Sequence, residues 1–398
     1  MSVTPVTSPP QLIWHETVSG EAVSPAKTLP LLKAAVAVAG DRTYLKRRLA
    51  RTLFRTDRMA EIVDWLRPIV DQNDSDPELL YHLGRAALVS GDCQTAYKAL
   101  SLAAKSGFRG ALGWAAHALA RLQRTDEAIE IALQALEDST PGFRPLALLA
   151  RLLPVRGETE RLWDLCVDLR ARGFWGGYLP AVSAFAAAAT RHNQEVAALM
   201  NPARWFSATR LGLRKNFNES LSAELLANGN ISSVPSSKAT RGDSAWVEDL
   251  HIFGGPLAKE LLAECRRCAT DYVAQREHFT EDVMMAHRPG CVKLKTWAAF
   301  LHGDGFQRWH VHPEGWISGV YYVDVPKLER ADGGTEGDIE FGVFPFTDGI
   351  PNFDGHCWRI RPEAGTLLLF PSHYAHRTWP TKVSNWRLSI AFDVIARQ

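Results

Sequence analysis

Three histidines in the last quarter of the chain have the type and spacing of a metal-binding group. His310 and His312 lie two residues apart in the run Trp309-His310-Val311-His312-Pro313, and His376 follows 64 residues after His312. Side chains alternate along a β-strand, so imidazoles at positions i and i+2 point to the same side of a sheet. A third imidazole from a later strand would complete a facial set of ligands and leave open positions on the metal, which suits non-haem Fe(II).

An arginine and a serine further along the chain indicate a site for an anion. Arg387 and Ser389 share one face of a predicted strand, and the apolar Leu388 and Ile390 share the other. If the apolar face packs outward against helices, Arg387 points into the protein, where a guanidinium is costly unless it meets an anion. Its planar fork suits a carboxylate, with the Ser389 hydroxyl as a further donor.

The elements that must position these side chains are strands. Apolar and polar residues alternate after Cys291, and the segments with this pattern lie near residues 292–296, 339–343 and 387–394, with a short apolar run at 366–370. Several short strands separated by turn residues predict a double-stranded β-helix of the jelly-roll or cupin-like kind. Such a fold can hold a small metal site in its mouth.

The front half of the chain repeats itself. It is rich in alanine, leucine and arginine, and similar patterns of apolar and small residues begin near residues 43, 77, 109, 143 and 177. A period of about 34 residues predicts paired helices that stack into a superhelix. Such an array offers a concave groove for a peptide or protein. Alternatively, it is a structural arm that packs on the next domain or makes a homodimer.

The fold class predicted from these patterns is α+β, with an all-α repeat superhelix followed by the double-stranded β-helix. A run rich in Ser, Gly, Asn and Pro, which begins at Asn228, marks the expected boundary. The predicted divisions are an N-terminal segment at 1–42, helical repeats at 43–227, a linker at 228–245 and the β-helix domain at 246–398.

Composition narrows the classes of partner. The formal net charge is +1, from 45 basic and 44 acidic residues, so no overall field favours nucleic acid or an anionic membrane. No run approaches the eighteen apolar residues of a membrane span. The six cysteines form no disulfide framework. We therefore expect a reducing, cytoplasmic setting, which also keeps iron ferrous.

Together the C-terminal motifs resemble the 2-oxoglutarate/Fe(II)-dependent oxygenase superfamily over about residues 245–398. They are the run from His310 to Tyr322, the run from Gly365 to Ser372, His376-Arg377, and Arg387-Leu388-Ser389. The front half is similar to tetratricopeptide repeats over roughly residues 43–200. The first resemblance implies Fe(II) as cofactor and 2-oxoglutarate as cosubstrate, with no catalytic residue beyond the metal ligands. The ligands it implies are His310, His312 and His376, and the cosubstrate-binding residues are Arg387, Ser389, Tyr322 and Ser318.

One position departs from the family pattern, His-x-Asp/Glu followed by a distal His. His312 stands where the carboxylate is usual. It supplies the third ligand, or Glu314 supplies a carboxylate, or His310 and His376 bind the metal alone and water fills the gap. Spacing favours His312, because a turn must fit before the next strand begins near Ile317.

The resemblance implies hydroxylation of a C–H bond, on a peptide or protein residue recruited with the help of the repeats. One alternative keeps the chemistry and takes a small metabolite or natural product as substrate. Another is a repeat-based binding protein whose oxygenase domain has lost turnover. His302, His356 and His373 are expected at the surface or behind the ligands.

Overall fold

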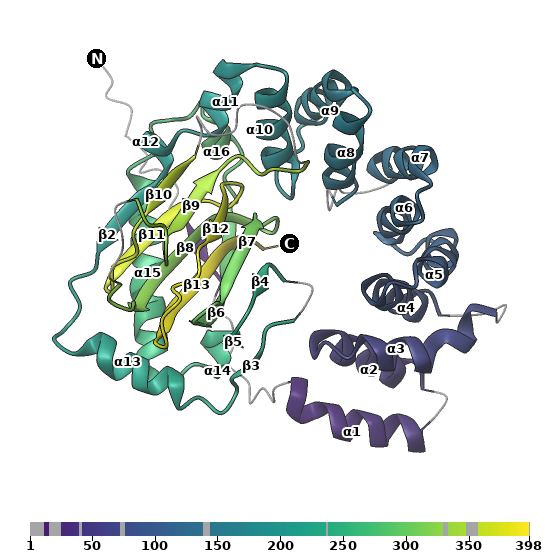
Figure 1. Cartoon of the computed structure of the whole chain (residues 1–398), viewed down its shortest axis with the longest axis horizontal. Coiled ribbons are helices and arrows are strands. Elements are labelled where there is room, and N and C mark those ends of the chain that lie inside the picture. The colour runs from purple at the N-terminus through teal and green to yellow at the C-terminus, as the bar shows by residue number, and fades with distance from the viewer. Residues whose placement is uncertain are drawn as a thin grey trace, which may run out of the picture.

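The structure is a computed structural model that describes residues 12–15, 25–39, 42–71, 76–137, 144–235, 238–328, 333–347 and 357–397. It has two parts, an array of helices and a pair of β-sheets (Figure 1). No helix among the described residues has both the length and the apolar character needed to cross a membrane.

Paired helices form the array, as the sequence predicted. The pairs are α2 (Thr43–Arg55) with α3 (Met59–Leu66), α4 (Pro77–Ser90) with α5 (Cys93–Lys105), α6 (Ala111–Arg121) with α7 (Thr125–Glu137), α8 (Arg144–Val155) with α9 (Thr159–Ala171), and α10 (Leu179–Ala189) with α11 (Asn193–Leu199). Successive pairs begin 33 to 35 residues apart. An additional helix, α1 (Pro25–Val38), packs on α2.

Helix α4 illustrates why the repeat sequence folds this way. Asp76 caps its N-terminus by accepting hydrogen bonds from two amides of the first turn, and Pro77 follows at a position that needs no N–H. Gly91 ends the helix with φ of 90°, a conformation that glycine adopts without strain. Inside the helix, a Cβ on Gly84 would lie 2.4 Å from Leu100 Cγ. Glycine is therefore required where α4 and α5 approach each other.

The strands form two sheets. In order across the larger sheet they are β2 (Ser207–Arg210), β11 (Thr366–Pro371), β8 (Gly315–Asp324), β13 (Trp386–Ala396), β6 (Cys291–His302), β5 (Ser244–Glu248) and β3 (Ser232–Ser233), with β1 (Ile13–Trp14) also beside β6. Across the smaller sheet they are β10 (Trp358–Ile360), β9 (Ile339–Gly342), β12 (Ala375–Thr378), β7 (Phe306–His310) and β4 (Thr240–Arg241).

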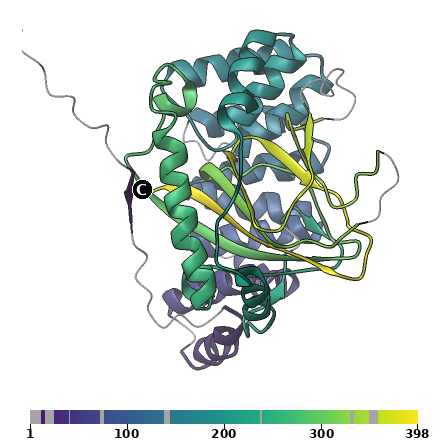
Figure 2. The ribbon, with the colours of Figure 1, turned by 90° about the vertical axis from the view of Figure 1, so that its left-hand side faces the viewer.

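The path of the chain through these sheets is that of the predicted double-stranded β-helix. Strands β6, β8, β11 and β13 lie in the larger sheet and β7, β9, β10 and β12 in the smaller one, so the chain crosses repeatedly between them. Every pairing among these eight strands is antiparallel. Helix α15 (Pro256–Ala274) runs along the larger sheet (Figure 2), with Leu261, Leu262 and Cys265 buried.

The predicted domain boundaries were wrong in one region. Strand β2 pairs with β11, and α13 (Phe217–Leu226) packs on α15 and β8, so residues 207–226 belong to the β domain and not to the repeats. The expected linker at 228–245 supplies β3, β4 and the start of β5. These strands are two to five residues long. Such short strands carry too few alternations to reveal themselves in sequence.

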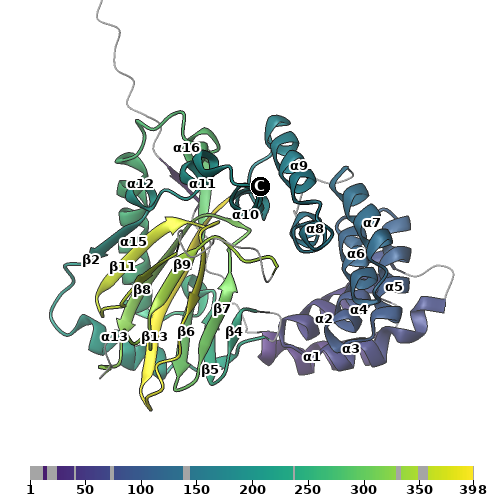
Figure 3. The ribbon, with the colours of Figure 1, turned by 45° about the horizontal axis from the view of Figure 1, so that its top comes forward.

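The array and the β domain share part of their packing. One core cluster extends from Ala116 of α6 through the last helix pairs into the sheets, and a separate cluster holds α1 to α6 together. The rings of Phe185 and Phe346 meet edge to face with centroids 5.3 Å apart. At the other end of the array, Arg55 pairs with Glu248 at 3.1 Å. The array therefore curves around one side of the β domain, with its concave side toward the sheets (Figure 3).

A 3-10 helix, η1 (Arg67–Asp71), follows α3, and three short α-helices complete the described elements. They are α12 (Pro202–Trp205), α14 (Leu250–Phe253) and α16 (Val283–Ala286).

Candidate metal centre

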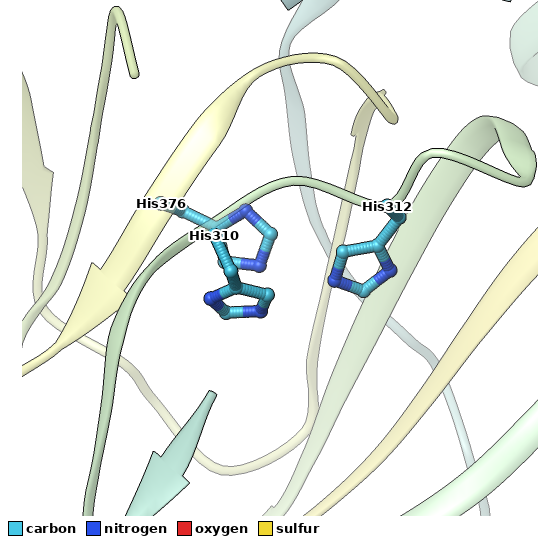
Figure 4. A group of neighbouring side chains, drawn as sticks. All are labelled: His310, His312 and His376. Atoms are coloured by element: carbon cyan, nitrogen blue, oxygen red, sulfur yellow. The ribbon is translucent and has the colours of Figure 1, made fainter. Parts of the chain in front are cut away.

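Two neighbouring strands of the smaller sheet bring His310 and His376 together. His310 ends β7, and His376 lies directly opposite it on β12. His312 comes from the connection that leads to β8, where its backbone N–H donates to the carbonyl of Ser372 at 3.0 Å. The sequence prediction placed His310 and His312 on one strand, but β7 ends at His310. The two rings nevertheless gather beside His376 (Figure 4).

The three imidazoles are close enough to bind one metal ion. One ligand nitrogen from each ring lies within 4.8 Å of the other two. Ring centroids are 4.2 Å apart for His310 and His376, and 5.1 Å apart for each of the other pairs. Within the described residues, this is the group whose ligand atoms converge in this way.

Each imidazole is oriented through its Nδ1 atom. Nδ1 of His310 lies 2.8 Å from the carbonyl oxygen of Arg308, and Nδ1 of His376 lies 3.1 Å from that of Tyr374. Nδ1 of His312 lies 2.6 Å from Oδ1 of Asp393. Because an Nδ1–H that donates to oxygen leaves Nε2 as the neutral ligand atom, all three Nε2 atoms are available to a metal. The site therefore fits a cation that prefers imidazole ligands.

Asp393 is a functional residue that the sequence analysis did not single out. It lies on β13 with its side chain buried, and its Oδ1 also accepts from the hydroxyl of Ser318 at 2.7 Å. Its carboxylate is not one of the converging ligand groups, but it forms a hydrogen bond with Nδ1 of His312. The sequence did contain a signal for Asp393. It lies on the same face of its strand as Arg387 and Ser389, and the opposite face of that strand is apolar.

Ser318 lies at the histidine end of the β domain. Its hydroxyl contacts Asp393 and, at 2.8 Å, the hydroxyl of Ser372. Ser318 also lines the same cavity as Tyr322, the other residue of β8 that is expected in the cosubstrate site. Through Asp393, the Ser318 hydroxyl also supports the orientation of His312.

Burial fixes the charge state of two ligands. Burial and, next in size, the neighbouring His312 together lower the pKa of His310 to about 3. The pKa of His376 is held well below its usual range, first by burial and then by His310 and His312. Both imidazoles are therefore neutral near neutral pH, and a metal displaces no proton from them.

Glu314, the alternative third ligand, is turned away from the histidines. Its carboxylate accepts from Lys295 Nζ at 2.7 Å, and its side chain is 67% exposed. The structure thus gathers His312 and not Glu314 with the other two histidines.

The predicted anion-binding residues lie deeper between the sheets. Arg387 is buried, and its Nη1 donates to the carbonyl of Gly337 at 3.0 Å. Burial lowers the pKa of Arg387, whereas Tyr322 and Asp338 act in the opposite direction. Burial also raises the pKa of Tyr322 to about 12, so its hydroxyl stays protonated as a donor. Ser389 pairs with Tyr322 across β13 and β8.

A narrow cavity connects this guanidinium with the metal ligands. His310, His312 and His376 line it together with Tyr322, Arg387 and Ser389. Its volume is about 40 Å³. The donors that line it, imidazoles that can hold a metal and the guanidinium of Arg387, suit a diacid held between a metal and an arginine.

The remaining histidines stay outside the group. His302 contacts a carboxylate oxygen of Asp243 and the carbonyl of Ser384, each at 2.9 Å. His373 is buried, and its Nε2 lies 2.9 Å from the carbonyl of Leu199. His356 lies outside the described residues.

Comparison with known proteins agrees with this geometry. Residues 295–393 match the sequence model of a family described as putative 2OG-Fe(II) oxygenase. The matched segment contains the three histidines, Arg387 and Asp393. None of the curated proteins matches the chain in sequence.

Several solved structures are similar to about half of this chain. A Pseudomonas putida prolyl-4-hydroxylase is 17% identical over 50% of this chain and 99% of that chain, with a TM-score of 0.34. HygX from Streptomyces hygroscopicus, with nickel and 2-oxoglutarate bound, is 13% identical over 50% and 86%, with a TM-score of 0.35. A Burkholderia pseudomallei oxidoreductase of the 2OG-Fe(II) oxygenase family is 14% identical over 52% and 91%, with a TM-score of 0.31. TM-scores this low carry no argument. The assignment of the C-terminal domain therefore rests on the family match and on its three converging histidines.

Proposed function

Because the C-terminal domain is that of a 2OG-Fe(II) oxygenase, we propose that this chain hydroxylates a C–H bond of a peptide or protein held between the helix pairs and the metal centre. The helix pairs, which we assign to the tetratricopeptide type from their period of 33 to 35 residues, would act as the substrate-binding arm.

One observation carries this proposal. A continuous cleft of about 1840 Å³ is lined both by the inner side of the helix array and by His310 and His312. Sites for small molecules usually enclose about 300–1,000 Å³. A cleft of this size suits an extended peptide better than a compact metabolite. Its walls on the array side include Phe54, Trp114 and Tyr178.

The roles of the side chains follow from their positions. His310, His312 and His376 would hold Fe(II), which supplies the oxidising chemistry when dioxygen and 2-oxoglutarate are bound. Arg387 would grip the distal carboxylate of 2-oxoglutarate, because a guanidinium makes two parallel hydrogen bonds to a carboxylate. Ser389 and the protonated hydroxyl of Tyr322 would donate to the same group.

In this reaction one atom of dioxygen would enter the substrate C–H bond, and the other would enter the succinate that forms as 2-oxoglutarate loses CO₂. The test is succinate release by the purified full chain, with Fe(II) present or chelated, in the presence of peptide pools or metabolite pools. We expect iron-dependent succinate that rises with peptides. A rise only with metabolites would transfer the same chemistry to a small substrate, and no succinate under any condition would reject the proposal.

A further inference from the structure

Three arginines of the helix array that line the cleft have no ion-pair partner among the described residues. Arg85 of α4, together with Arg144 and Arg151 of α8, lines the cleft on the side opposite the histidines. We call these three residues, with Phe54, Trp114 and His117, the concave cluster. None of the three arginines forms an ion pair with a carboxylate of the described residues.

Aromatic rings hold two of these arginines in place. The Arg85 guanidinium carbon lies 4.0 Å from the ring centre of Phe54 and 5.0 Å from that of Trp114. Arg144 stacks on Trp114 at 4.3 Å. Stacking fixes the plane of a guanidinium and leaves its edge N–H groups free to donate. The neighbouring rings therefore hold the guanidinium groups of the two arginines in fixed positions at the cleft wall.

Two buried polar atoms of the concave cluster also need a partner. Nε of Arg85 and Nε2 of His117 are buried without a hydrogen-bond partner in the described structure. Buried polar groups are normally hydrogen-bonded, so an orphaned pair beside a cleft indicates groups that a ligand completes.

The acidic residues of the cleft do not supply that partner. Glu248 pairs with Arg55, Glu314 with Lys295, and Glu336 with Lys382. The carboxylate of Asp393 bonds to His312, and that of Asp304 accepts from the backbone N–H of Asp243. The carboxylates of Glu248, Glu314 and Glu336 are thus paired with cations nearby, whereas no ion pair joins them to the three arginines of the concave cluster.

We propose that the concave cluster binds an anionic side chain of the peptide substrate, a carboxylate or a phosphate, and so selects acidic segments for oxidation. The inference rests on the proposed function, because it takes the substrate to be a peptide in the same cleft. A peptide fits better than nucleic acid, since exposed apolar side chains of the cleft lining, Val89 and Val155, offer contacts to neighbouring residues of a peptide substrate.

The test measures binding to the full chain loaded with Fe(II) and 2-oxoglutarate under anaerobic conditions. Fluorescence anisotropy would compare labelled peptides of equal length that are rich in glutamate, that carry phosphoserine, or that carry glutamine at the same positions. At least one acidic peptide should bind about tenfold more tightly than the glutamine peptide and weaken with salt. The tighter of the two acidic peptides identifies carboxylate or phosphate as the recognised group.

Variants locate the site. The double variant Arg144→Gln/Arg151→Gln changes exposed residues, so its fold should survive, and it should lose about tenfold in affinity for the acidic peptide. Arg48→Gln changes an arginine on α2 that does not line the cleft, and its affinity should equal that of the wild type. Unchanged affinity in the double variant would overturn the proposal, as would tighter binding of a single-stranded oligonucleotide of equal charge.

Turnover separates this inference from the proposed function. Succinate formed equally well with acidic and glutamine peptides would reject the anion site and retain the oxygenase. Arginine-dependent binding without any succinate would reject the oxygenase activity and retain the anion site.

Discussion

The metal centre and the concave cluster, which face each other across one cleft, differ in how their polar groups are satisfied. In the metal centre, Nδ1 of each histidine has an oxygen partner within the described structure. In the concave cluster, Arg85 and His117 each bury a nitrogen without one. The first site is oriented before any ligand arrives, as precise chemistry requires, whereas the second is completed by what it binds. Changes in the two regions should therefore have separable effects.

The largest effect is expected from removing a metal ligand. His376→Ala should abolish iron binding and succinate formation, a loss greater than the roughly 100-fold that removal of a supporting partner costs. Iron content per chain and succinate release measure it. The matched control is His302→Ala, because His302 bonds to Asp243 and Ser384 away from the centre. Retention of stoichiometric iron by the His376 variant would contradict the assignment.

Arg387→Met should act on the cosubstrate and not on the metal. Losing charged hydrogen bonds to a carboxylate corresponds to a rise of about 10–100-fold in the KM for 2-oxoglutarate. The affinity for Fe(II) should remain that of the wild type, and Arg387→Lys should restore part of the lost affinity. Undiminished oxygen uptake in Arg387→Met would instead indicate a three-histidine oxygenase that needs no 2-oxoglutarate.

Asp393→Asn tests whether the hydrogen bond between Asp393 and the His312 ring is needed for metal binding. The variant keeps the shape of the side chain but removes the carboxylate that bonds to His312, so affinity for Fe(II) should fall about 10–100-fold. Competition with a chelator measures the affinity. Glu314→Gln is the contrast, because Glu314 pairs with Lys295 on the exposed side. An equal fall in both variants would show that the ligand set has been misread.

Mild acid should lower the free energy of unfolding through histidines in both regions, and this should be the smallest of the predicted effects. Burial lowers the pKa of His373 in the β domain and of His117 in the concave cluster to about 4 each. A depressed pKa means that the unfolded chain takes up protons first. The stability from these neutral histidines is therefore complete above pH 6.5 and declines as the pH falls toward 4.

Between pH 7 and pH 5, a histidine of this kind contributes a loss of about 2 kcal/mol in the free energy of unfolding. Urea denaturation of the metal-free chain at both pH values measures the loss, which should be smaller by that amount in His373→Gln. His117→Gln is the counterpart in the array. A loss that is unchanged in both variants would mean that these histidines do not stay neutral in the folded chain.

Periodicity allowed the sequence to predict much of this molecule. The helix pairs begin at or within two residues of the predicted starts, because the same pattern of about 34 residues recurs along the front half of the chain. Strand β13 was also predictable, because alternation over its eleven residues distinguishes Arg387 and Ser389 from their apolar neighbours. Both patterns are long enough to be read locally.

What the sequence could not predict depends on contacts between distant segments. His312 lies beyond the end of β7, and its ring joins the others because the chain there bonds to Ser372. Asp393 gains its role from meeting His312, 81 residues away. The concave cluster forms only when α2, α4, α6 and α8 stack. None of these contacts between distant residues is marked by a local sequence pattern.

The central claim is that three imidazoles and no carboxylate hold the iron. X-ray absorption spectroscopy of the anaerobic Fe(II) protein tests it directly, because imidazole rings give a characteristic multiple-scattering pattern that can be counted. We predict three imidazoles in the wild type and two in His312→Ala. Two imidazoles in the wild type, with or without a carboxylate, would contradict the account.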